Sequence, residues 1–537
     1  MGLVVGVLAH VCLFIRGEWH LQTPQIALSH SALYLACPAL AAVCRGSVLC
    51  GLLDMVARGS WGYLPGLVGS IVLYRVFFHP LTAAGFPGPW YARVSKLWHV
   101  WAARHSKNHL VLAHLHAKYG DFVRTGPAEV TVFHPDVFVA LESPRSECIK
   151  ADWYDLIHPS LGLVTVRDKS VHAARRREWN RGFTAKAVAE HEAKMLKHVD
   201  QLDRCIEADA RARRVSDVRD LLLWFGLDAM SDFTFSRSFR MLQARDWHYM
   251  VPKLLSAFSL VGPLSPAPWL FQLSFKLGPR VGVLGDWFDA VAWSSAQMHH
   301  RIQSGSSGQT PDLVHYLMEG DADAKDEDRR LWLEGDSLVA ILAGSEPTAV
   351  ALTAVFCELA KHPEHAHKIY LELAHVHVTD LAALAGLAHL NAVIKEAHRL
   401  YPALLTAGNR KTTARGIDIA GTFIPPNTTI VAPRFSIARR DDCFEKPHDF
   451  VPERWTTRPE MILNMAAYNP FGIGHRSCVG RSMAMDTMRY VVARLVKKYE
   501  FHAGPGDDNL RVMEDIKDRF TPRPGALRLC FVPRDEA

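Results

Sequence analysis

The sequence predicts a mainly α-helical fold with small β sheets, preceded by an N-terminal membrane anchor made of apolar segments. Long stretches carry apolar residues at helical spacing, whereas β-branched and aromatic residues gather in short stretches around Gly and Pro, as in paired strands. The predicted helices cover residues 187–210, 218–233, 331–361, 384–401 and 481–499, and the predicted strands lie within residues 122–133 and 417–431.

The composition indicates a large globular protein without a polynucleotide partner. The chain has 537 residues, of which 49% are hydrophobic and 22% are charged, enough for a sizeable core. Its net charge of +6 is mild and no Lys/Arg block stands out, so we expect no nucleic acid to bind. The ten cysteines form no CxxC pair, which argues against a zinc module or a disulfide scaffold and favours a reducing compartment.

Three apolar stretches precede residue 85, at residues 1–15, 32–56 and 61–78. A spanning helix needs about 20 apolar residues, and each stretch is short or interrupted by a charge. We therefore expect a membrane anchor of one to three segments, with a buried hydrophobic subdomain as the alternative. Arg75 and Arg93 lie at and after the end of the last stretch, which places the following chain on the cytoplasmic side.

A rigid break follows at Phe86-Pro87-Gly88-Pro89. We place a domain boundary there, with residues 1–85 as the anchor and residues 86–537 as the body of the protein.

Basic residues form one face of the predicted helix around residue 175. His172 and Arg176 are four apart and share a helical face, so both can reach one anion, with Trp179 packing behind them. The alternative is an ordinary solvated basic face.

The long predicted helix at residues 331–361 contains Ala343-Gly344-Ser345-Glu346-Pro347-Thr348. Small residues leave room above a flat cofactor, and an acid beside a hydroxyl can relay protons. Pro347 supplies neither a hydroxyl nor a backbone N–H, and we expect it to kink the helix.

A lone cysteine, Cys478, lies in a glycine-rich loop just before the predicted helix at residues 481–499. Amide dipoles and the neighbouring Arg476 are expected to favour its thiolate, which is a nucleophile or a metal ligand. Gly474 and Gly480 can take positive φ and admit a flat group, and Phe471 can cover its edge. The loop thus predicts a cofactor cradle, with a buried structural cysteine as the alternative.

This loop resembles the haem-ligand loop of cytochromes P450, whose pattern is Phe-x-x-Gly-x-Arg-x-Cys-x-Gly. The fixed positions are met by Phe471, Gly474, Arg476, Cys478 and Gly480. The resemblance covers residues 86–537 and implies a cytochrome P450 fold that holds haem b (iron protoporphyrin IX), with Cys478 as the iron ligand.

The resemblance also implies roles for residues outside the loop. His172, Arg176 and Arg410 would bind haem propionates. Glu346 and Thr348 would deliver protons, although Pro347 occupies the place of the family's threonine.

A further pair of motifs, Glu396-x-x-Arg399 and Pro452-Glu453-Arg454-Trp455, resembles the family's buried charge network. In isolation Glu396 and Arg399 would be an ordinary surface pair. Trp153, Tyr154, Ile157 and residues 403–407 are pocket candidates by analogy, residues 258–273 match the segment at the substrate entrance, and residues 510–533 match the closing sheet.

The function implied by the resemblance is that of a haem-thiolate monooxygenase on the cytosolic face of the endoplasmic reticulum membrane. Its electrons would come from a separate NADPH-cytochrome P450 reductase, with cytochrome b5 as an optional second donor. Its substrate would be a lipophilic fungal secondary metabolite: a terpenoid, an alkaloid or a polyketide.

Two other interpretations remain open at this stage. Pro347 would be tolerated in a haem-thiolate isomerase or dehydratase, which needs no reductase. A non-enzymatic membrane haem-binding protein would show no turnover with any substrate.

Overall fold

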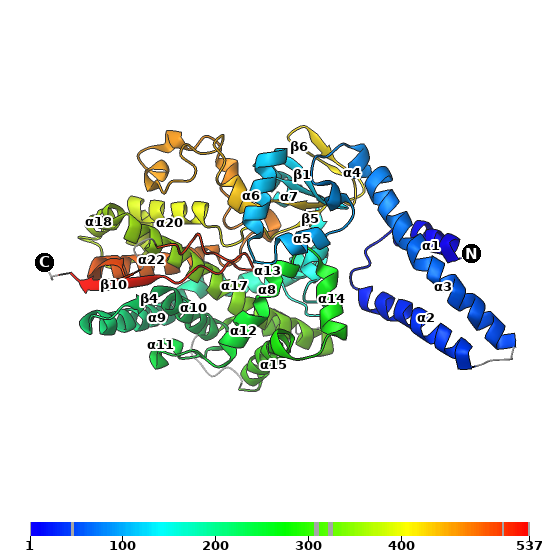
Figure 1. Ribbon diagram of the computed structural model, residues 1–537. Helices are drawn as coiled ribbons and strands as arrows, with labels where there is room; N and C mark the ends of the chain where they lie inside the picture. Colours follow the sequence, from blue (N-terminus) through cyan, green and yellow to red (C-terminus); the bar gives the residue numbers. More distant parts are fainter. Residues whose placement is uncertain (1, 44–47, 305–310, 321–325, 507–509, 535–537) are drawn as a thin grey trace.

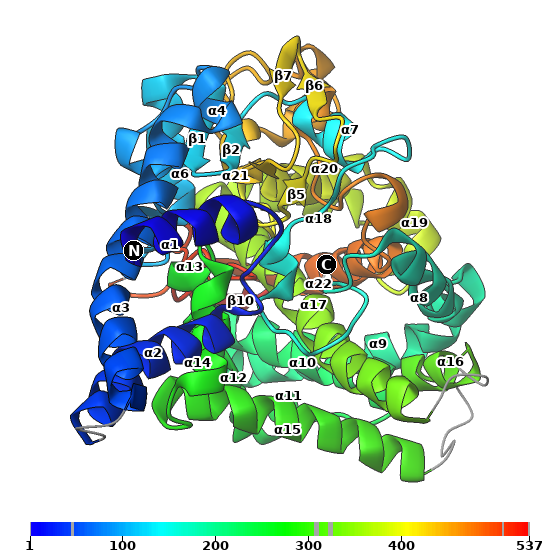
Figure 2. The same cartoon turned by 90° about the vertical axis from the view of Figure 1, so that its right-hand side faces the viewer.

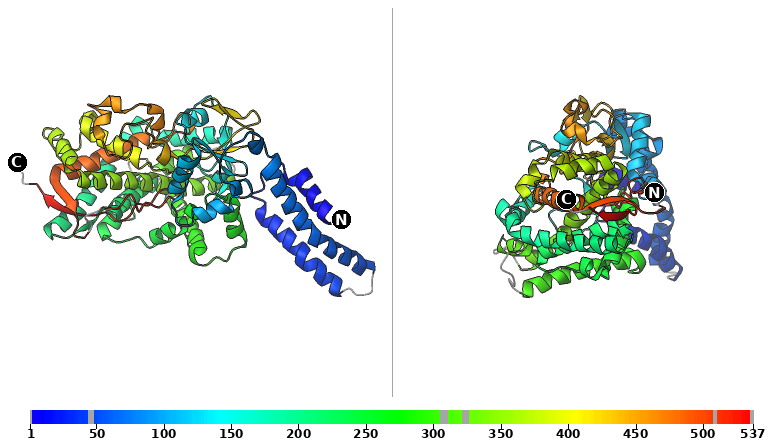
Figure 3. Two further views of the ribbon diagram at one scale, coloured as in Figure 1. Left: turned by 45° about the horizontal axis from the view of Figure 1, so that its top comes forward. Right: turned by 90° about the vertical axis from the view of Figure 1, so that its left-hand side faces the viewer.

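Three apolar helices, α1 (Gly2–Ala9), α2 (Thr23–Val43) and α3 (Val48–Leu73), form a sheaf that projects from a larger helical body (Figures 1 and 3). The computed structural model describes residues 2–43, 48–304, 311–320, 326–506 and 510–534. Glycines let α1 and α3 touch backbone to backbone, since a Cβ on Gly66 would lie 2.2 Å from the Leu3 carbonyl oxygen. Such small-residue contacts are typical of helices that pack within a membrane.

The loop between α1 and α2 returns to the body and is fastened there by Glu18. The Glu18 carboxylate pairs with Arg167 (Nη1 to Oε2, 2.7 Å) and with Lys411 (Nζ to Oε1, 2.6 Å). Burial opposes the charge, but hydrogen bonds from Arg167 and Lys411 lower the pKa of Glu18 to about 2. The sheaf is therefore attached to the body by ion pairs as well as by the chain after α3.

The body is mainly helical, which confirms the predicted class. Before the central helix it contains α4 (Pro80–Ala83), α5 (Leu97–Ala102), α6 (Asn108–Tyr119), α7 (Val137–Glu142), α8 (Lys169–Gly182), α9 (Ala185–Arg211), α10 (Val218–Phe235), α11 (Met241–Ala244), α12 (Met250–Phe258), α13 (Val261–Leu264), α14 (Pro268–Leu277), α15 (Gly282–Gln303) and α16 (Leu313–Gly320). The central and later helices are α17 (Asp326–Lys361), α18 (Pro363–Glu372), α19 (Leu381–Gly386), α20 (Ala388–Leu400), α21 (Arg434–Ile437) and α22 (Arg481–Lys498).

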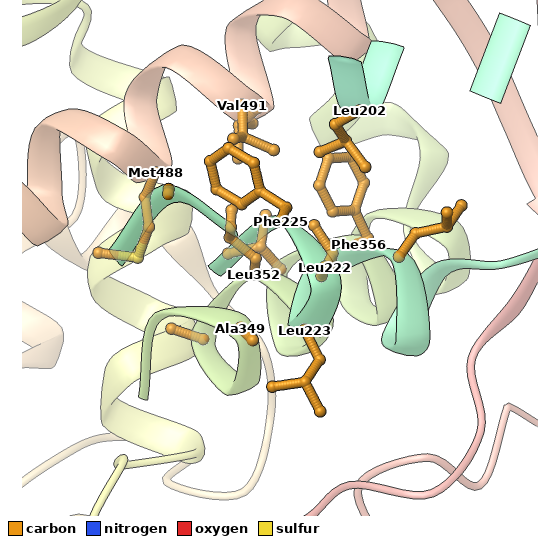
Figure 4. Close-up of a cluster of buried hydrophobic side chains, with 14 of the residues drawn as sticks. Leu202, Leu222, Leu223, Phe225, Ala349, Leu352, Phe356, Met488 and Val491 are labelled. Atoms are coloured by element: carbon orange, nitrogen blue, oxygen red, sulfur yellow. The ribbon is translucent and has the colours of Figure 1, made fainter. Parts of the chain in front are cut away.

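The main core lies where α9, α10, α17 and α22 meet, and α17 runs through the middle of the body (Figures 2 and 4). Each helix contributes apolar side chains that are almost wholly buried, such as Leu202, Phe225, Phe356 and Val491. Burying each of these stabilises the fold by roughly 1.5–3 kcal/mol. This packing fixes α17 against α22, the helix that follows the cysteine loop.

Three small sheets complete the fold. The largest has the order β1 (Phe122–Gly126), β2 (Glu129–Val132), β8 (Thr429–Val431), β5 (Arg410–Lys411) and β3 (Ile149–Lys150). The second has the order β4 (Ser216–Asp217), β10 (Arg528–Pro533) and β9 (Tyr499–Ala503), and the third pairs β6 (Ile417–Ile419) with β7 (Thr422–Ile424). In the largest sheet Lys150 pairs with Arg410, so two cations distant in sequence become neighbours.

Most predicted elements are confirmed, and the differences have local causes. The central helix begins at Asp326 instead of residue 331, and it continues as one helix through Pro347. The single helix predicted at residues 384–401 is two helices, because the extended backbone of Leu387 (ψ 114°) separates α19 from α20. Within residues 510–533 the structure has one named strand, β10, preceded by irregular chain.

Candidate active site

A cavity of about 320 Å³ lies between the central helix α17 and the cysteine loop. Ala343, Gly344, Pro347 and Thr348 of α17 line it, as do several loop residues. The Cys478 side chain, although deep in the body, is accessible from inside this cavity. The loop residues that line the cavity are Phe471, Gly472, Arg476, Ser477, Cys478, Val479 and Gly480.

The cysteine loop is shaped by glycines, though not all in the way the sequence predicts. Gly474 has φ +69°, and a Cβ there would lie 2.1 Å from the Glu142 carbonyl oxygen, so this glycine lets the loop pack on α7. Gly472 has the same φ and lines the cavity, a role that the sequence analysis missed. Gly480 lines the cavity with φ −89°, so the prediction of a positive φ there is wrong.

The protonation of Cys478 also differs from expectation. Burial raises the pKa of its thiol, and this outweighs the Gly480 N–H and the charges of Arg176 and Arg481, which lower it. The prediction that dipoles and nearby charge favour the thiolate is therefore wrong for the protein alone. A bound metal cation would stabilise the thiolate form of this side chain directly.

Basic side chains converge on the cavity wall. Arg176 donates from Nη1 to the Ser477 carbonyl oxygen (2.6 Å). Arg410 donates to the hydroxyl of Tyr154 (2.7 Å), and Arg476 donates to the carbonyl oxygen of Arg167 (3.0 Å). The basic residues that line the cavity are Lys150, His172, Arg176, His398, Arg410, Arg434 and Arg476.

The basic side chains on the cavity wall are buried close together, so their positive charges repel one another. Burial, followed by the charge of Lys150, lowers the pKa of His172 to about 3. Burial and the charges of Arg476 and Arg410 place the pKa of Lys150 well below its ordinary value. A flat group carrying two carboxylates would offset this repulsion, so the residues fit a haem with its propionates.

The two predicted proton-delivery residues face different spaces. Thr348 lines the cavity and donates its hydroxyl to the Gly344 carbonyl oxygen (3.3 Å). Glu346 is absent from the described residues that line this cavity. Its carboxylate instead accepts a hydrogen bond from Thr521 in a small adjoining cavity near Arg519 and Arg523, and Thr521 lines both spaces.

Glu346 is buried in a way that suits proton exchange. Burial raises its pKa to about 7, against the charges of Arg523 and Arg519, which lower it. A carboxyl group with this pKa is divided between its two protonation states at neutral pH.

The predicted charge network is present and fully buried. The Glu396 carboxylate accepts from Arg399 (Nη2 to Oε1, 2.8 Å) and from Arg454 (Nε to Oε1, 3.0 Å), and all three side chains are 0% exposed. Trp455, which stands where the family has Phe, donates from its indole nitrogen to Glu396 Oε2 (2.8 Å). The surface-pair alternative for Glu396 and Arg399 is excluded by this burial.

Other pocket candidates are divided between two spaces. Tyr154 lines the main cavity and, together with Trp153 and Ile157, also lines an adjoining cavity of about 60 Å³. Ala403 and Leu404 line the main cavity, in agreement with the analogy for residues 403–407. Lys150, Arg434 and Thr521 also line the main cavity, but each is an isolated polar residue in the sequence, so no local pattern predicts this position.

Comparison with known proteins agrees with this geometry. The family model described as Cytochrome P450 matches residues 87–531. Tryprostatin B 6-hydroxylase of Aspergillus fumigatus is 32% identical over 528 residues, covering 96% of this chain and 93% of that protein. Cytochrome P450 monooxygenase notG' of Aspergillus versicolor is 34% identical, covering 96% and 94%, and Cytochrome P450 monooxygenase FCK2 of Fusarium pseudograminearum is 34% identical, covering 99% and 97%. Since the model spans most of the chain and these relatives match nearly end to end, the chain belongs to the cytochrome P450 family of haem b-dependent monooxygenases, which are oxidoreductases.

Proposed function

We propose that this monooxygenase inserts one oxygen atom from O2 into a lipophilic secondary metabolite, namely a terpenoid, an alkaloid or a polyketide. The observation that carries the proposal is the cavity in which Cys478 is accessible beneath small and apolar residues of α17. The cavity's lining is largely apolar, which suits a lipophilic ligand. One relative is named as a hydroxylase of tryprostatin B, which supports a secondary-metabolite substrate.

Cys478 is the proposed iron ligand. His172, Arg176, Arg410 and Arg476 would hold the propionates, a role supported by their lining the same cavity and by their positive charge or hydrogen-bond donors. The haem held there would supply the chemistry of dioxygen reduction, in which two electrons from NADPH and two protons let one oxygen atom enter the substrate and the other leave as water.

Phe471 and Gly480 border the cofactor space, and Gly474 supports the loop from behind. The Phe471 ring is itself held between neighbours, with the Arg481 guanidinium 5.7 Å from its centroid and the His398 ring at 5.3 Å.

Proton delivery is proposed to run through Glu346 and the hydroxyl of Thr521. Glu346 would take a proton in the small cavity and donate it to the Thr521 oxygen, while the Thr521 hydroxyl turns and releases its own proton into the main cavity, which it also lines. This route replaces the threonine that the family has at position 347, where this chain has Pro347. Thr348 is a second hydroxyl at the cavity, already donating to its own helix.

Glu346→Gln and Thr521→Val are each expected to lower the product formed per NADPH consumed, since a positioned acid contributes about 10²–10⁴ in rate. In the unchanged protein this ratio should fall as pH rises through about 7, where Glu346 loses its proton, and Glu346→Gln should remove that dependence. Product is measured by chromatography and NADPH by absorbance, and the ratio of the two is followed from about pH 6 to pH 8.

Ser337→Ala is the matched control, because Ser337 is a buried hydroxyl on α17 that donates to the Glu334 carbonyl oxygen. If Thr348→Val lowered the product formed per NADPH consumed and Thr521→Val left it unchanged, the route through Thr521 would be contradicted.

The electron donor is proposed to be NADPH-cytochrome P450 reductase, with cytochrome b5 as an optional donor. Microsomes that contain this chain and the reductase are expected to place one labelled oxygen atom from isotopically labelled O2 into the product, seen by mass spectrometry. A product formed without NADPH and without label would instead identify an isomerase or dehydratase.

Residues 1–85 are proposed as the membrane anchor and residues 86–537 as the haem domain, held on the cytosolic face of the endoplasmic reticulum. Two helices are long and apolar enough to cross a membrane in the described part of the chain. In Arg329–Lys361, 78% of the most apolar 18-residue window is buried within the body, whereas in Trp61–Ala83, which begins within α3, that share is 17%. Helix α14 contacts α2, so the apolar segment around residues 258–273 lies on the side of the body that faces the anchor helices (Figure 1).

Deletion of residues 1–85 is expected to move most of the protein from the membrane pellet to the supernatant, because it removes the exposed apolar sheaf. Sedimentation after cell lysis, followed by immunoblotting, measures the change. A truncated protein that still pellets would show that α12–α14 bind lipid by themselves.

A further inference from the structure

Two histidines and a glutamate come together on the body, outside the cavity described above. His365 lies on α18, His389 lies near the start of α20, and Glu453 lies in the short 3-10 helix η5 (Pro452–Trp455). One ligand atom from each lies within 4.8 Å of the others. We propose that His365, His389 and Glu453 form a second metal site, which binds a divalent ion of the zinc class.

The spacing of the three side chains matches such an ion. His365 Nδ1 lies 3.1 Å from His389 Nε2 and 3.7 Å from Glu453 Oε1. Ligands bound to zinc at about 2.0–2.2 Å in a tetrahedral arrangement lie roughly 3.3–3.6 Å from one another. The two distances from His365 lie close to this spacing, and the third pair of ligand atoms, on His389 and Glu453, lies within 4.8 Å.

The three ligands are held by rigid elements. Glu372 accepts the backbone N–H groups of His389 (2.8 Å) and Leu390 (2.9 Å), which fixes the first turn of α20. Glu453 is followed directly by Arg454, which is pinned to the buried Glu396. A site on fixed backbones loses little entropy when it binds its ion.

The protonation of the site is also suitable. A neutral imidazole offers one lone pair to a metal ion, so His365 and His389 can contribute one each. In the metal-free protein one imidazole donates to the other. Metal binding moves this proton to the opposite ring nitrogen or to water, and no electron transfer is involved.

Lys368 competes for the carboxylate, since its Nζ lies 2.6 Å from Glu453 Oε1. Its side chain is 48% exposed, so it can turn into solvent when an ion arrives.

A second group with ligand-like spacing, Glu18, His20 and Asp155, shows the contrast. There Arg167 pairs with both carboxylates and Lys411 also binds Glu18, so cations already occupy the position of a metal. At the His365 site one cation, the half-exposed Lys368, lies against the carboxylate, in place of the two cations there. The proposed ion would brace α18, α20 and η5 and so support the Glu396 network, independently of which substrate is oxidised.

The test uses the full-length holoenzyme in detergent, purified without a histidine tag and stripped with a chelator. Zinc is added, and bound zinc per haem is measured by mass spectrometry, with affinity from competition against a chromophoric chelator. The unchanged protein is expected to bind one more zinc ion than His389→Ala, or to bind it at least tenfold more tightly, and calcium should not compete. Glu453→Gln should weaken binding in the same way.

His20→Ala is the matched control and should bind zinc like the unchanged protein. Lys368→Met should bind more tightly, because it frees the Glu453 carboxylate, and it keeps the test informative if His389→Ala fails to fold. Equal zinc binding by the unchanged protein, His389→Ala and Lys368→Met would overturn the proposal.

Discussion

Cys478→Ser is expected to abolish the carbon-monoxide difference band of the reduced protein and, with it, all product formation. A serine hydroxyl stays protonated where a thiol loses its proton to a metal, so it cannot supply the thiolate that the family's haem requires. The side chain is the one cysteine among those lining the cavity in the described part of the chain, so no neighbour there can replace it. Difference spectra of microsomes at equal protein content measure the effect.

Haem content is measured in parallel, because loss of the ligand and loss of the fold are different outcomes. Cys530→Ser is the control, since Cys530 lies on β10, away from the cavity. A persistent difference band in Cys478→Ser would remove Cys478 as the iron ligand and end the proposed function.

Glu396→Ala is expected to destabilise the protein by about 3–5 kcal/mol, because it leaves two buried guanidinium groups without their shared carboxylate. Arg399 would keep its bonds to the carbonyl oxygens of Ala438 (2.8 Å) and Pro447 (2.6 Å), but its charge would be uncompensated. The free energy of unfolding is measured in denaturant by loss of the difference band, where the transition is reversible.

Glu460→Ala is the matched control, since Glu460 pairs with Arg458 at 3.4 Å and both side chains are more than half exposed. An exposed pair contributes about 0–1 kcal/mol, so this variant should unfold close to the unchanged protein. Equal losses in the two variants would show that burial of the Glu396 network adds nothing to stability.

The sequence allowed the motif residues to be named before any geometry was known. Four of the predicted cofactor contacts, His172, Arg176, Arg410 and Arg476, line one cavity with Cys478. Local patterns succeed there because a loop or a helix turn places neighbours in the sequence close together in space. They fail for Gly480, whose φ depends on how α22 begins, and for the long helix predicted at residues 384–401, which an extended residue divides.

Predictions failed most clearly where distant segments meet. The pattern of its own helix could not predict which way the Glu346 side chain points, because the residue that donates a hydrogen bond to it, Thr521, is 175 positions away. The basic side chains on the cavity wall also come from distant segments, since strand pairing in the largest sheet sets Lys150 beside Arg410.

The sequence by itself determined the class of the fold, the cysteine loop and the chemical types available for haem binding, because these depend on periodicity and on short motifs. The tertiary structure alone decided which charges converge, which way Glu346 faces and that His365, His389 and Glu453 meet. The physical reason is that helix packing and strand register set contacts between segments far apart in the chain, and burial then sets the protonation of the groups brought together.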